Sequence, residues 1–256
     1  MAYRNDVDLD FLEEIPSEDL VDLVDCLIVD KDGKSRYTEE LTGNDLYKKY
    51  HPDHTRYWHL IAAEIQCFGA NSLSTLFRGG KGVLYREVLT DVCDKMGAKY
   101  KKNNEVIMIE NNLMTKIIED SLGKMTEPER AEFAKIIGID NVLSLSAAGL
   151  TAAIQALFRM GGFASYRLTL VIANAISRSI VGHGLSLAGN AALVRAASIL
   201  TGPVGWALAG LWTVVDLAGP ADRVTIPAVI NVALLRKRYQ AEKEGIMGDI
   251  EKELDN

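Results

Sequence analysis

Cysteine is scarce in this chain, with three residues among 256. Cys26, Cys67 and Cys93 lie far apart, each in an apolar segment with helical spacing. An odd number of widely separated thiols argues against a disulfide framework and against a cysteine-based metal site, because both need cysteines at short, regular spacing. The sequence therefore predicts buried structural cysteines in a reducing compartment.

Histidine is also scarce, and the four residues show no metal-ligand spacing. His51, His54 and His59 lie close together, but His59 and Glu64 are five positions apart and would not share a helix face well. Zinc ligands on a helix are expected four positions apart. We interpret the cluster as polar residues at a helix N-terminus, and we predict that the protein binds no metal and no cofactor.

Catalytic motifs are lacking as well. The sequence has no G-x-S-x-G, no P-loop and no cysteine with an adjacent histidine. Residues 78–82, RGGKG, precede a predicted helix, so their backbone N–H groups and Lys81 could hold an anion, but a flexible corner is the favoured interpretation. His183 is interpreted as a hydrogen-bonded core residue rather than a catalyst. The sequence thus predicts no catalytic residue and a protein that is not an enzyme.

Positive charge is too thinly spread for a nucleic-acid-binding protein. The chain has 28 Lys and Arg against 35 Asp and Glu, a net charge of −7, and no segment concentrates enough bases to neutralise a row of phosphates. The N-terminal residues MAYRNDVDLDFLEE are acidic and have no apolar core of the signal-peptide kind. We expect a cytoplasmic protein, with peripheral contact to the inner face of the cytoplasmic membrane as an extension of that expectation.

Alternating apolar and polar residues of the β-strand kind are absent, and helical spacing takes their place. Ser17, followed by two acidic residues, is predicted to cap the first helix, and Thr126 with Glu129 forms a capping box. The expected helices cover residues 17–28, 38–50, 57–68, 83–96, 103–122 and 127–137. The fold class is therefore predicted to be all-α.

The composition changes sharply near residue 140. Residues 1–140 are acidic, whereas residues 141–235 contain only Asp216 and Asp222 against five arginines. We therefore predict an acidic helical domain over residues 1–140 and an apolar, Gly/Ala-rich helical domain over residues 141–256 with a charged tail. The two regions are expected to pack together. A structural charge pair between Arg223 and either Asp216 or Asp222 is expected in the second, because buried charges usually pair.

The longest uncharged run, residues 196–215, meets the length of a transmembrane helix. Gly202-Pro203 interrupts it, and the part after the proline has 13 residues, about 20 Å of helix against roughly 30 Å of hydrocarbon. A second break is expected at Ile226-Pro227. Central helices of a soluble domain are the favoured interpretation, and a hairpin released to a membrane or client is the alternative. Its predicted contact residues are Trp206, Trp212, Val204, Val214 and Arg195.

Several segments resemble the YaaW-like family of bacterial proteins, which is related to the ubiquinol–cytochrome c reductase assembly chaperones. In the first half they are Asp8-Leu-Asp-Phe-Leu12, residues 58–69 (WHLIAAEIQCFG) and Leu84-Tyr-Arg86. In the second half they are Gly182-His-Gly-Leu185, Gly202-Pro-Val-Gly205 and residues 223–229 (RVTIPAV). The resemblance spans nearly the whole chain, but it carries no catalytic residue or cofactor with it. By analogy, it implies protein binding during assembly of a membrane complex.

The leading functional hypothesis is a non-enzymatic helical protein that binds a protein client or assembles at an anionic membrane surface. A membrane-perturbing effector, such as a toxin or defence protein that inserts its apolar helices, is the second hypothesis. A cytosolic enzyme built around His183 or residues 78–82 is the third. The sequence leaves the partner, any trigger for insertion and a homo-oligomeric state open.

Overall fold

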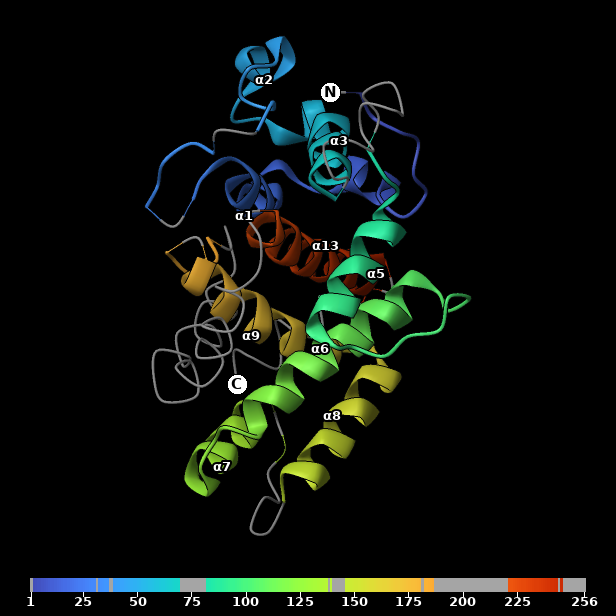
Figure 1. The fold of residues 1–256 in the computed structure, drawn as a ribbon, viewed down its shortest axis with the longest axis vertical. Helices are drawn as coiled ribbons and strands as arrows, with labels where there is room; N and C mark the ends of the chain where they lie inside the picture. The colour runs from blue at the N-terminus through green and yellow to red at the C-terminus, as the bar shows by residue number, and fades with distance from the viewer. Residues whose placement is uncertain are drawn as a thin grey trace.

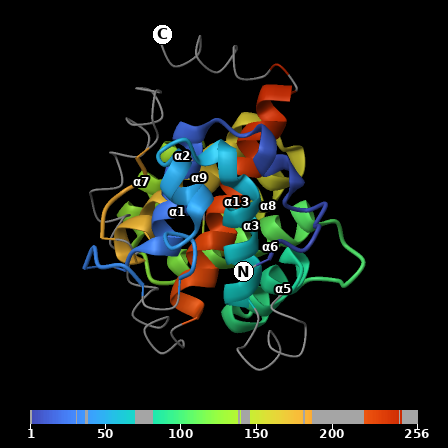
Figure 2. The same ribbon diagram turned by 90° about the horizontal axis from the view of Figure 1, so that it is seen from above.

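The protein is all-α, as the sequence predicts. The computed structural model describes residues 2–30, 32–36, 39–69, 82–137, 139, 146–180, 182–186, 221–243 and 245. Within these residues the regular elements are helices, and the one β-bridge, between Val29 and Ser35, is isolated. Figure 1 shows the helices gathered around a central one, α13, and Figure 2 shows the same arrangement from above.

The N-terminal helices are short. They are η1 (Asp10–Glu14), α1 (Ser17–Ile28), α2 (Asp45–Tyr50), η2 (His54–Tyr57) and α3 (Trp58–Gly69). Helix α1 buries Leu20, Leu23 and Leu27, the apolar positions whose spacing predicts it. Its bounds agree with the expected range, but the capping residue differs, because Pro16 and not Ser17 occupies the N-cap position. The Ser17 hydroxyl donates instead to the Pro52 carbonyl oxygen, 2.9 Å away, which holds the start of α1 against the η2 region.

Helix α2 is also shorter than predicted. The expected helix covers residues 38–50, but α2 begins at Asp45, because the Asn44 side chain caps it by accepting a hydrogen bond from the Leu46 N–H at 2.9 Å. Asn competes with helical hydrogen bonding and favours caps, so it is a start signal that apolar spacing alone does not reveal.

The remaining helices are longer. They are α5 (Tyr85–Met96), α6 (Val106–Leu122), α7 (Glu127–Ile136), α8 (Ala147–Met160), α9 (Gly162–Ile180) and α13 (Asp222–Lys243). The capping box predicted at Thr126 is confirmed, since the Glu129 side chain accepts the Thr126 backbone N–H at 2.7 Å. Helix α9 continues through residues 162–180, and Tyr166 and Leu168 are among its buried side chains.

Helix α13 forms the centre of the molecule. It packs most extensively on α9, and it also contacts α1, α3, α5 and α6. Every residue from 224 to 235 is buried, so this segment has no polar face, as expected for a helix enclosed on all sides. Both ribbon views place α13 between these neighbours (Figures 1 and 2). Helices from both predicted regions therefore share one core around α13, and the domain division at residue 140 stays a prediction.

The expected break at Ile226-Pro227 is wrong. Pro227 lies inside α13, in its second turn. A proline this close to the start of a helix removes one backbone hydrogen bond, to the carbonyl group four residues earlier, and leaves the rest of the helix intact. The neighbouring helices bury the segment on every side, and α13 continues past the proline to Lys243. The other expected break, at Gly202-Pro203, lies outside the described residues.

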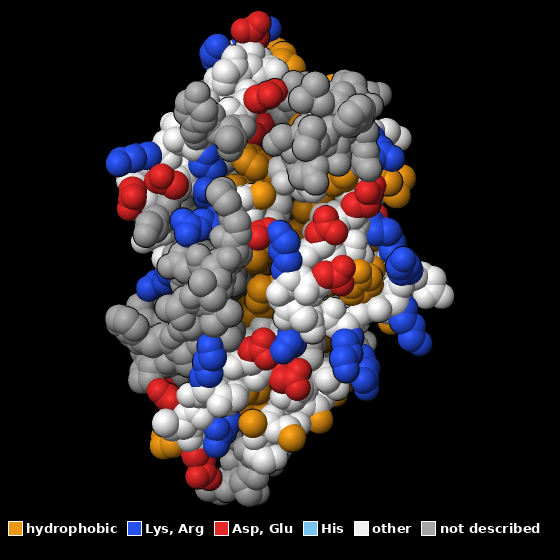
Figure 3. Space-filling view, viewed as in Figure 1, with side chains coloured by type: hydrophobic (Ala, Val, Ile, Leu, Met, Phe, Trp, Pro, Cys, Tyr) orange, Lys and Arg blue, Asp and Glu red, His pale blue; other side chains and the backbone are white. Residues whose placement is uncertain are grey.

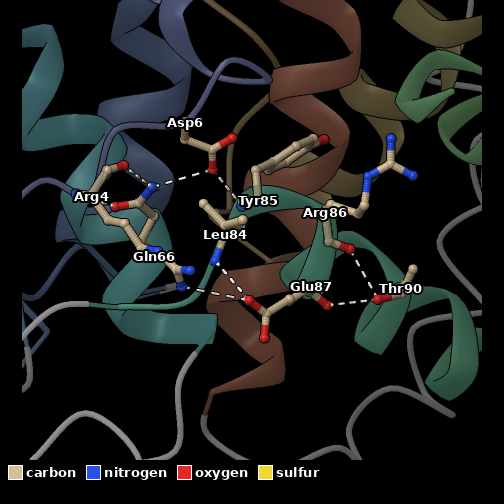
Figure 4. Close-up of polar contacts among 8 residues, drawn as sticks. All are labelled: Arg4, Asp6, Gln66, Leu84, Tyr85, Arg86, Glu87 and Thr90. Atoms are coloured by element: carbon tan, nitrogen blue, oxygen red, sulfur yellow. Dashed lines mark hydrogen bonds and ion pairs between the residues drawn. The ribbon is translucent and has the colours of Figure 1, made fainter. Parts of the chain in front are cut away.

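Asp6 ties the N-terminal segment to the beginning of α5 (Figure 4). Its buried carboxylate accepts the Tyr85 backbone N–H at 2.6 Å and the Gln66 side-chain amide at 3.2 Å. Gln66 also donates to the Arg4 carbonyl oxygen at 2.8 Å. A carboxylate at the N-terminus of α5 is favoured by the helix dipole and uses a backbone N–H that has no partner within the helix. Residues 4–6 are therefore part of the folded body.

The end of α3 approaches the chain before α5 very closely. The Val83 N–H donates to the Gln66 carbonyl oxygen at 3.1 Å. A Cβ atom on Gly82 would lie 2.2 Å from the Gln66 carbonyl carbon, so only glycine fits at position 82 without a backbone shift. This glycine fixes the spacing between α3 and α5.

Charges of both signs are interspersed on the face drawn in Figure 3, where Lys and Arg side chains lie among Asp and Glu. Within the described part of the chain, no helix has both the length and the apolar character needed to cross a membrane.

Candidate functional site

Three consecutive cationic residues, Arg236, Lys237 and Arg238, follow the fully buried stretch of α13. Successive residues of a helix point about 100° apart, so the three side chains leave the helix in different directions. Each one reaches a different neighbouring helix, and the partners that they find there differ in charge.

Arg236 reaches α6. Its Nε atom lies 3.1 Å from both carboxylate oxygens of Glu110, which is completely buried. The Tyr85 hydroxyl of α5 donates to the same carboxylate at 2.8 Å, and burial next to it raises the pKa of Tyr85 well above its ordinary value. The Arg236 guanidinium also lies 4.5 Å from the centre of the Phe11 ring. This cluster joins η1, α5, α6 and α13 and is paired in charge.

Arg238 reaches α1. Its guanidinium pairs with Asp19, which is buried, and with Glu242 one turn further along α13 at 2.9 Å. Burial raises the pKa of Asp19 to about 6 despite the nearby guanidinium. Arg238 therefore also has carboxylate partners.

Lys237 reaches α9 and finds a hydroxyl group. Its Nζ atom donates to Ser165 Oγ at 2.7 Å and lies 5.4 Å from the centre of the Phe158 ring. Only 6% of the residue is exposed, and among the described residues no carboxylate forms an ion pair with it. Burial lowers the pKa of Lys237 to about 8, with Glu110 opposing this shift and Arg236 adding to it. Among the described residues, Lys237 is therefore a buried cation with no carboxylate within ion-pair distance.

Lys237 lines a cleft of about 1010 Å³. One wall is formed by α6, from Ile107 to Asp120, and another by the corner between α8 and α9, from Gln155 to Ser165. The end of α13, from Lys237 to Ala241, closes a third side. The volume lies at the upper end of the range typical of small-molecule pockets, so the cleft can hold a peptide segment as well as a small ligand.

Two glycines make the corner between α8 and α9. Gly161 and Gly162 have φ angles of +69° and +63°, in the left-handed region that other residues rarely adopt. The chain therefore turns within two residues, and α9 begins on the wall of the cleft. The N–H groups in the first turn of a helix have no partner within it and favour negative charge. Ser165 lies in this first turn, next to Lys237.

Apolar and amide side chains complete the lining. Met108 and Met160 border the cleft and are 50% and 72% exposed, although most methionines of a folded protein are buried. Asn111 presents a buried side-chain oxygen that accepts no hydrogen bond from the part of the chain that the structure describes. Buried polar atoms are almost always paired, so this oxygen is suited to receive a donor from a bound ligand.

The contact residues predicted from the sequence lie outside the described residues. They are Trp206, Trp212, Val204, Val214 and Arg195. Asp216 of the expected charge pair lies outside them too, as does most of the loop 78–82. Asp222 is buried in the first turn of α13 and forms an ion pair with Lys95 of α5, a partner that the sequence did not suggest. Its pairing with Arg223, which is exposed, stays a prediction.

The histidines lie apart from the cleft. His54 is buried in η2, with Nδ1 2.5 Å from the Tyr57 hydroxyl oxygen, and burial lowers its pKa to about 4. Within the described ranges no three His, Cys, Asp or Glu residues are arranged to hold a metal ion. His183 is exposed, which corrects its interpretation as a core residue: it lies on a turn after α9, and its Nδ1 atom is 2.9 Å from the Gly184 carbonyl oxygen.

Lys237 does not stand out in the sequence, because it lies in the charged segment that follows residue 235. One signal was available. Three bases follow directly after 12 uncharged residues, and no glycine or proline stands between Ala228 and Arg238. A charge run that continues a buried helix has to pass through the edge of the core, where its members either pair or line a cavity.

The fold and the cleft define a helical protein built around one enclosed helix, with a cleft at the end of that helix. The chain belongs to the UPF0174 family. It is 48% identical over 244 residues to a UPF0174 protein of Helicobacter pylori strain J99. The aligned region covers 95% of this chain and 96% of the relative. It is 35% identical over 247 residues to the UPF0174 protein YaaW of Escherichia coli K12. That aligned region covers 93% of this chain and 97% of the relative. The resemblance to the YaaW-like family is thereby confirmed.

Two family models match the chain. Residues 53–230 match the family described as ubiquinol-cytochrome C chaperone, and residues 3–37 match a domain of unknown function, DUF3944. The first match includes α3, α5, α6, α8 and α9, and with them two walls of the cleft. No solved structure matches the chain.

Proposed function

We propose that this protein is a non-enzymatic, chaperone-like factor that binds a protein client in the cleft between α6, α8, α9 and α13. The observation that carries the proposal is the match of residues 53–230 to the ubiquinol-cytochrome C chaperone family, which supports a role of the chaperone or assembly-factor kind. The match includes the α6 wall and the α8–α9 corner. From the printed name of that family, ubiquinol-cytochrome C chaperone, we propose a client of the kind that such a chaperone serves.

The lining of the cleft suits a polypeptide client. Methionine side chains are flexible and polarisable, so they adapt to apolar side chains of different shapes, and exposed methionines are common on surfaces that bind several partners. Met108 and Met160 are exposed on α6 and at the end of α8, on two walls of the same cleft. Amide side chains of Asn111, Asn112 and Gln155 lie between them and can pair with a client backbone.

The thiols support a role without covalent catalysis. Burial raises the pKa of Cys93 to about 12, and it raises the pKa of Cys26 and of Cys67 as well. The nucleophile is the thiolate, which forms too little at neutral pH when the pKa is raised in this way. These three residues therefore support the non-enzymatic proposal.

Photo-crosslinking in cells tests client binding. The residue p-benzoylphenylalanine replaces Met160 in one variant and Val7, which is similarly exposed but lies away from the cleft, in the control. Position 160 should give discrete protein adducts that position 7 does not give. Mass spectrometry identifies the adduct, and the purified partner should then bind wild-type protein and lose affinity for the Met160→Asp variant. The same adducts from both positions, or full binding to Met160→Asp, would contradict the proposal.

Membrane attachment is a separate part of the proposal, and it rests on the sequence. Residues 141–235 have five arginines against two acids, and residues 196–215 carry no charge. We expect a peripheral attachment to anionic vesicles that weakens with salt, because salt screens the arginines. Flotation with vesicles containing anionic lipid checks this. The effector hypothesis requires in addition leakage of an entrapped dye that Val204→Asp or Val214→Asp abolishes. No flotation with any lipid composition would contradict both membrane hypotheses.

A further inference from the structure

We propose that the Lys237 ammonium group is a carboxylate receptor inside the cleft, and that it selects clients which present a carboxylate next to an apolar side chain. A chain-terminal carboxylate or an Asp or Glu side chain of the client would fill this role. The inference deepens the proposed client binding and rests on it.

The three cations of α13 differ in the charge of their partners. Arg236 and Arg238 each have a buried carboxylate partner, Glu110 and Asp19. Lys237 has the Ser165 hydroxyl, which accepts a hydrogen bond but carries no charge. A buried charge without an opposite charge is costly, so a ligand that supplies the missing charge gains more here than at an exposed lysine.

The lining of the cleft as a whole carries a net positive charge among the described residues. Within the described residues, Lys99, Lys116, Arg159 and Lys237 line it, against Glu119 and Asp120. The lining is therefore positive by two charges, in a chain whose net charge is −7. This local reversal of sign makes the cleft electrostatically complementary to an anion and would attract an acidic segment toward it.

A hydroxyl group, the start of α9 and an aromatic ring lie beside the Lys237 ammonium group. Ser165 and the first turn of α9 lie next to the ammonium group, and N–H groups at a helix N-terminus favour a negative ligand. The Phe158 ring lies 5.4 Å from Nζ and gives an apolar surface beside the charge. A single ammonium matches the single charge of a carboxylate, whereas phosphate groups are more often held by several cations or by the planar fork of arginine.

A pair of small probes tests the charge selectivity. The probes are 3-phenylpropionate and its neutral isostere 3-phenylpropionamide, which share the ring and the chain length. Dissociation constants are measured by NMR titration of the intact protein at pH 7. Since a hydrogen bond to a charged group contributes roughly 1.5–3 kcal/mol, the carboxylate should bind at least about tenfold more tightly than the amide. Equal binding of the two probes, or no binding of the carboxylate, would overturn the proposal.

Two lysine variants locate the selectivity. Lys237→Met keeps a side chain of similar length and removes the charge, so it should lose the preference for the carboxylate while its affinity for the amide stays within about twofold. Lys116→Met is the control, because Lys116 lines the same cleft but pairs with Asp120 at 2.5 Å. It should keep the preference. If Lys237→Met keeps it, or if phenyl phosphate binds wild-type protein more tightly than phenylpropionate, the carboxylate assignment is wrong.

The outcome can be separated from that of client binding. If the partner identified by crosslinking binds Lys237→Met as tightly as wild-type protein, the carboxylate receptor is refuted and client binding stands. If Lys237→Met fails to fold, as circular dichroism would show, Lys237→Gln takes its place in the titration, because it also removes the charge and should lose the preference for the carboxylate.

Discussion

Replacement of Lys237 by methionine should change the pH dependence of folding. Burial lowers the pKa of this lysine from 10.5 to about 8 in the folded protein. The unfolded chain holds the proton up to the higher value, so the folded state releases it first. The unfolding free energy of wild-type protein therefore rises as the pH increases from 8 toward 10.5. Below pH 8 Lys237 is charged in the folded protein, and its burial destabilises the fold by about 3 kcal/mol.

The measurable quantity is the difference in unfolding free energy between the variant and wild-type protein. Methionine removes the buried charge and keeps most of the side-chain volume, so the variant should be relatively more stable at pH 7 than at pH 9. Titration with the pKa values above gives a change of about 1.3 kcal/mol in the difference between these two pH values. Urea unfolding followed by circular dichroism at both pH values measures it.

Comparing the variant with wild-type protein at the same two pH values cancels the contributions of the other titrating groups to the unfolding free energy. Burial raises the pKa of Tyr57 and of Tyr85, but these groups are the same in both proteins and cancel in the difference. Lys116→Met serves as the control, because its partly exposed pair with Asp120 contributes about 0–1 kcal/mol at either pH. A difference for Lys237→Met that is constant from pH 7 to pH 9 would refute the placement of Lys237 as an unbalanced buried cation.

Two further changes test the packing of the core away from the cleft. Arg236→Met should cost roughly 3–5 kcal/mol of unfolding free energy in urea, since Glu110 would stay buried without its partner, and the double variant Arg236→Met/Glu110→Leu should recover part of the loss. Gly82→Ala should destabilise by on the order of 1–3 kcal/mol, because its Cβ would meet the Gln66 backbone at 2.2 Å, whereas Gly43→Ala, whose nearest atom is 3.5 Å away, should lose much less; equal losses at the two glycines would contradict the close approach.

The fold class could be predicted because its signals are local. The capping box at Thr126 lies within four residues, and the leucines of α1 repeat at helical spacing within one segment. Such signals need no knowledge of the rest of the chain. Capping residues are harder to predict where a side chain binds a distant partner. The Ser17 hydroxyl binds Pro52, which is 35 residues away, and so it is not the cap that its position suggests.

Proline shows a second limit of local reasoning. Pro227 was expected to break a helix, and that rule holds for helices in solvent. In α13 the neighbouring helices bury the segment on all sides, and their packing outweighs one lost hydrogen bond near the helix start. Burial by five other helices is a tertiary property, so the residues on either side of the proline do not reveal it.

The cleft could not be predicted for a related reason. Its lining comes from α6, from the α8–α9 corner and from the end of α13, which are separated by up to about 130 positions in the sequence. Arg236, Lys237 and Arg238 look alike as a charge run, and only the surrounding helices distinguish them, by offering Glu110, a hydroxyl and Asp19. The difference between structural and functional cations therefore arises from the partners.

Enclosure of α13 explains why a site arises at its end. A helix that is apolar on every face has to regain polar character where it leaves the core, and three adjacent bases at that point must enter three different environments. Two of these environments supply a carboxylate, which stabilises the junction of α13 with α1 and α6. The third opens into the cleft. Under the proposed carboxylate receptor, a ligand that balances Lys237 would bind only the folded state and would stabilise the same helix that organises the core, so the proposal links client binding to the stability of this protein.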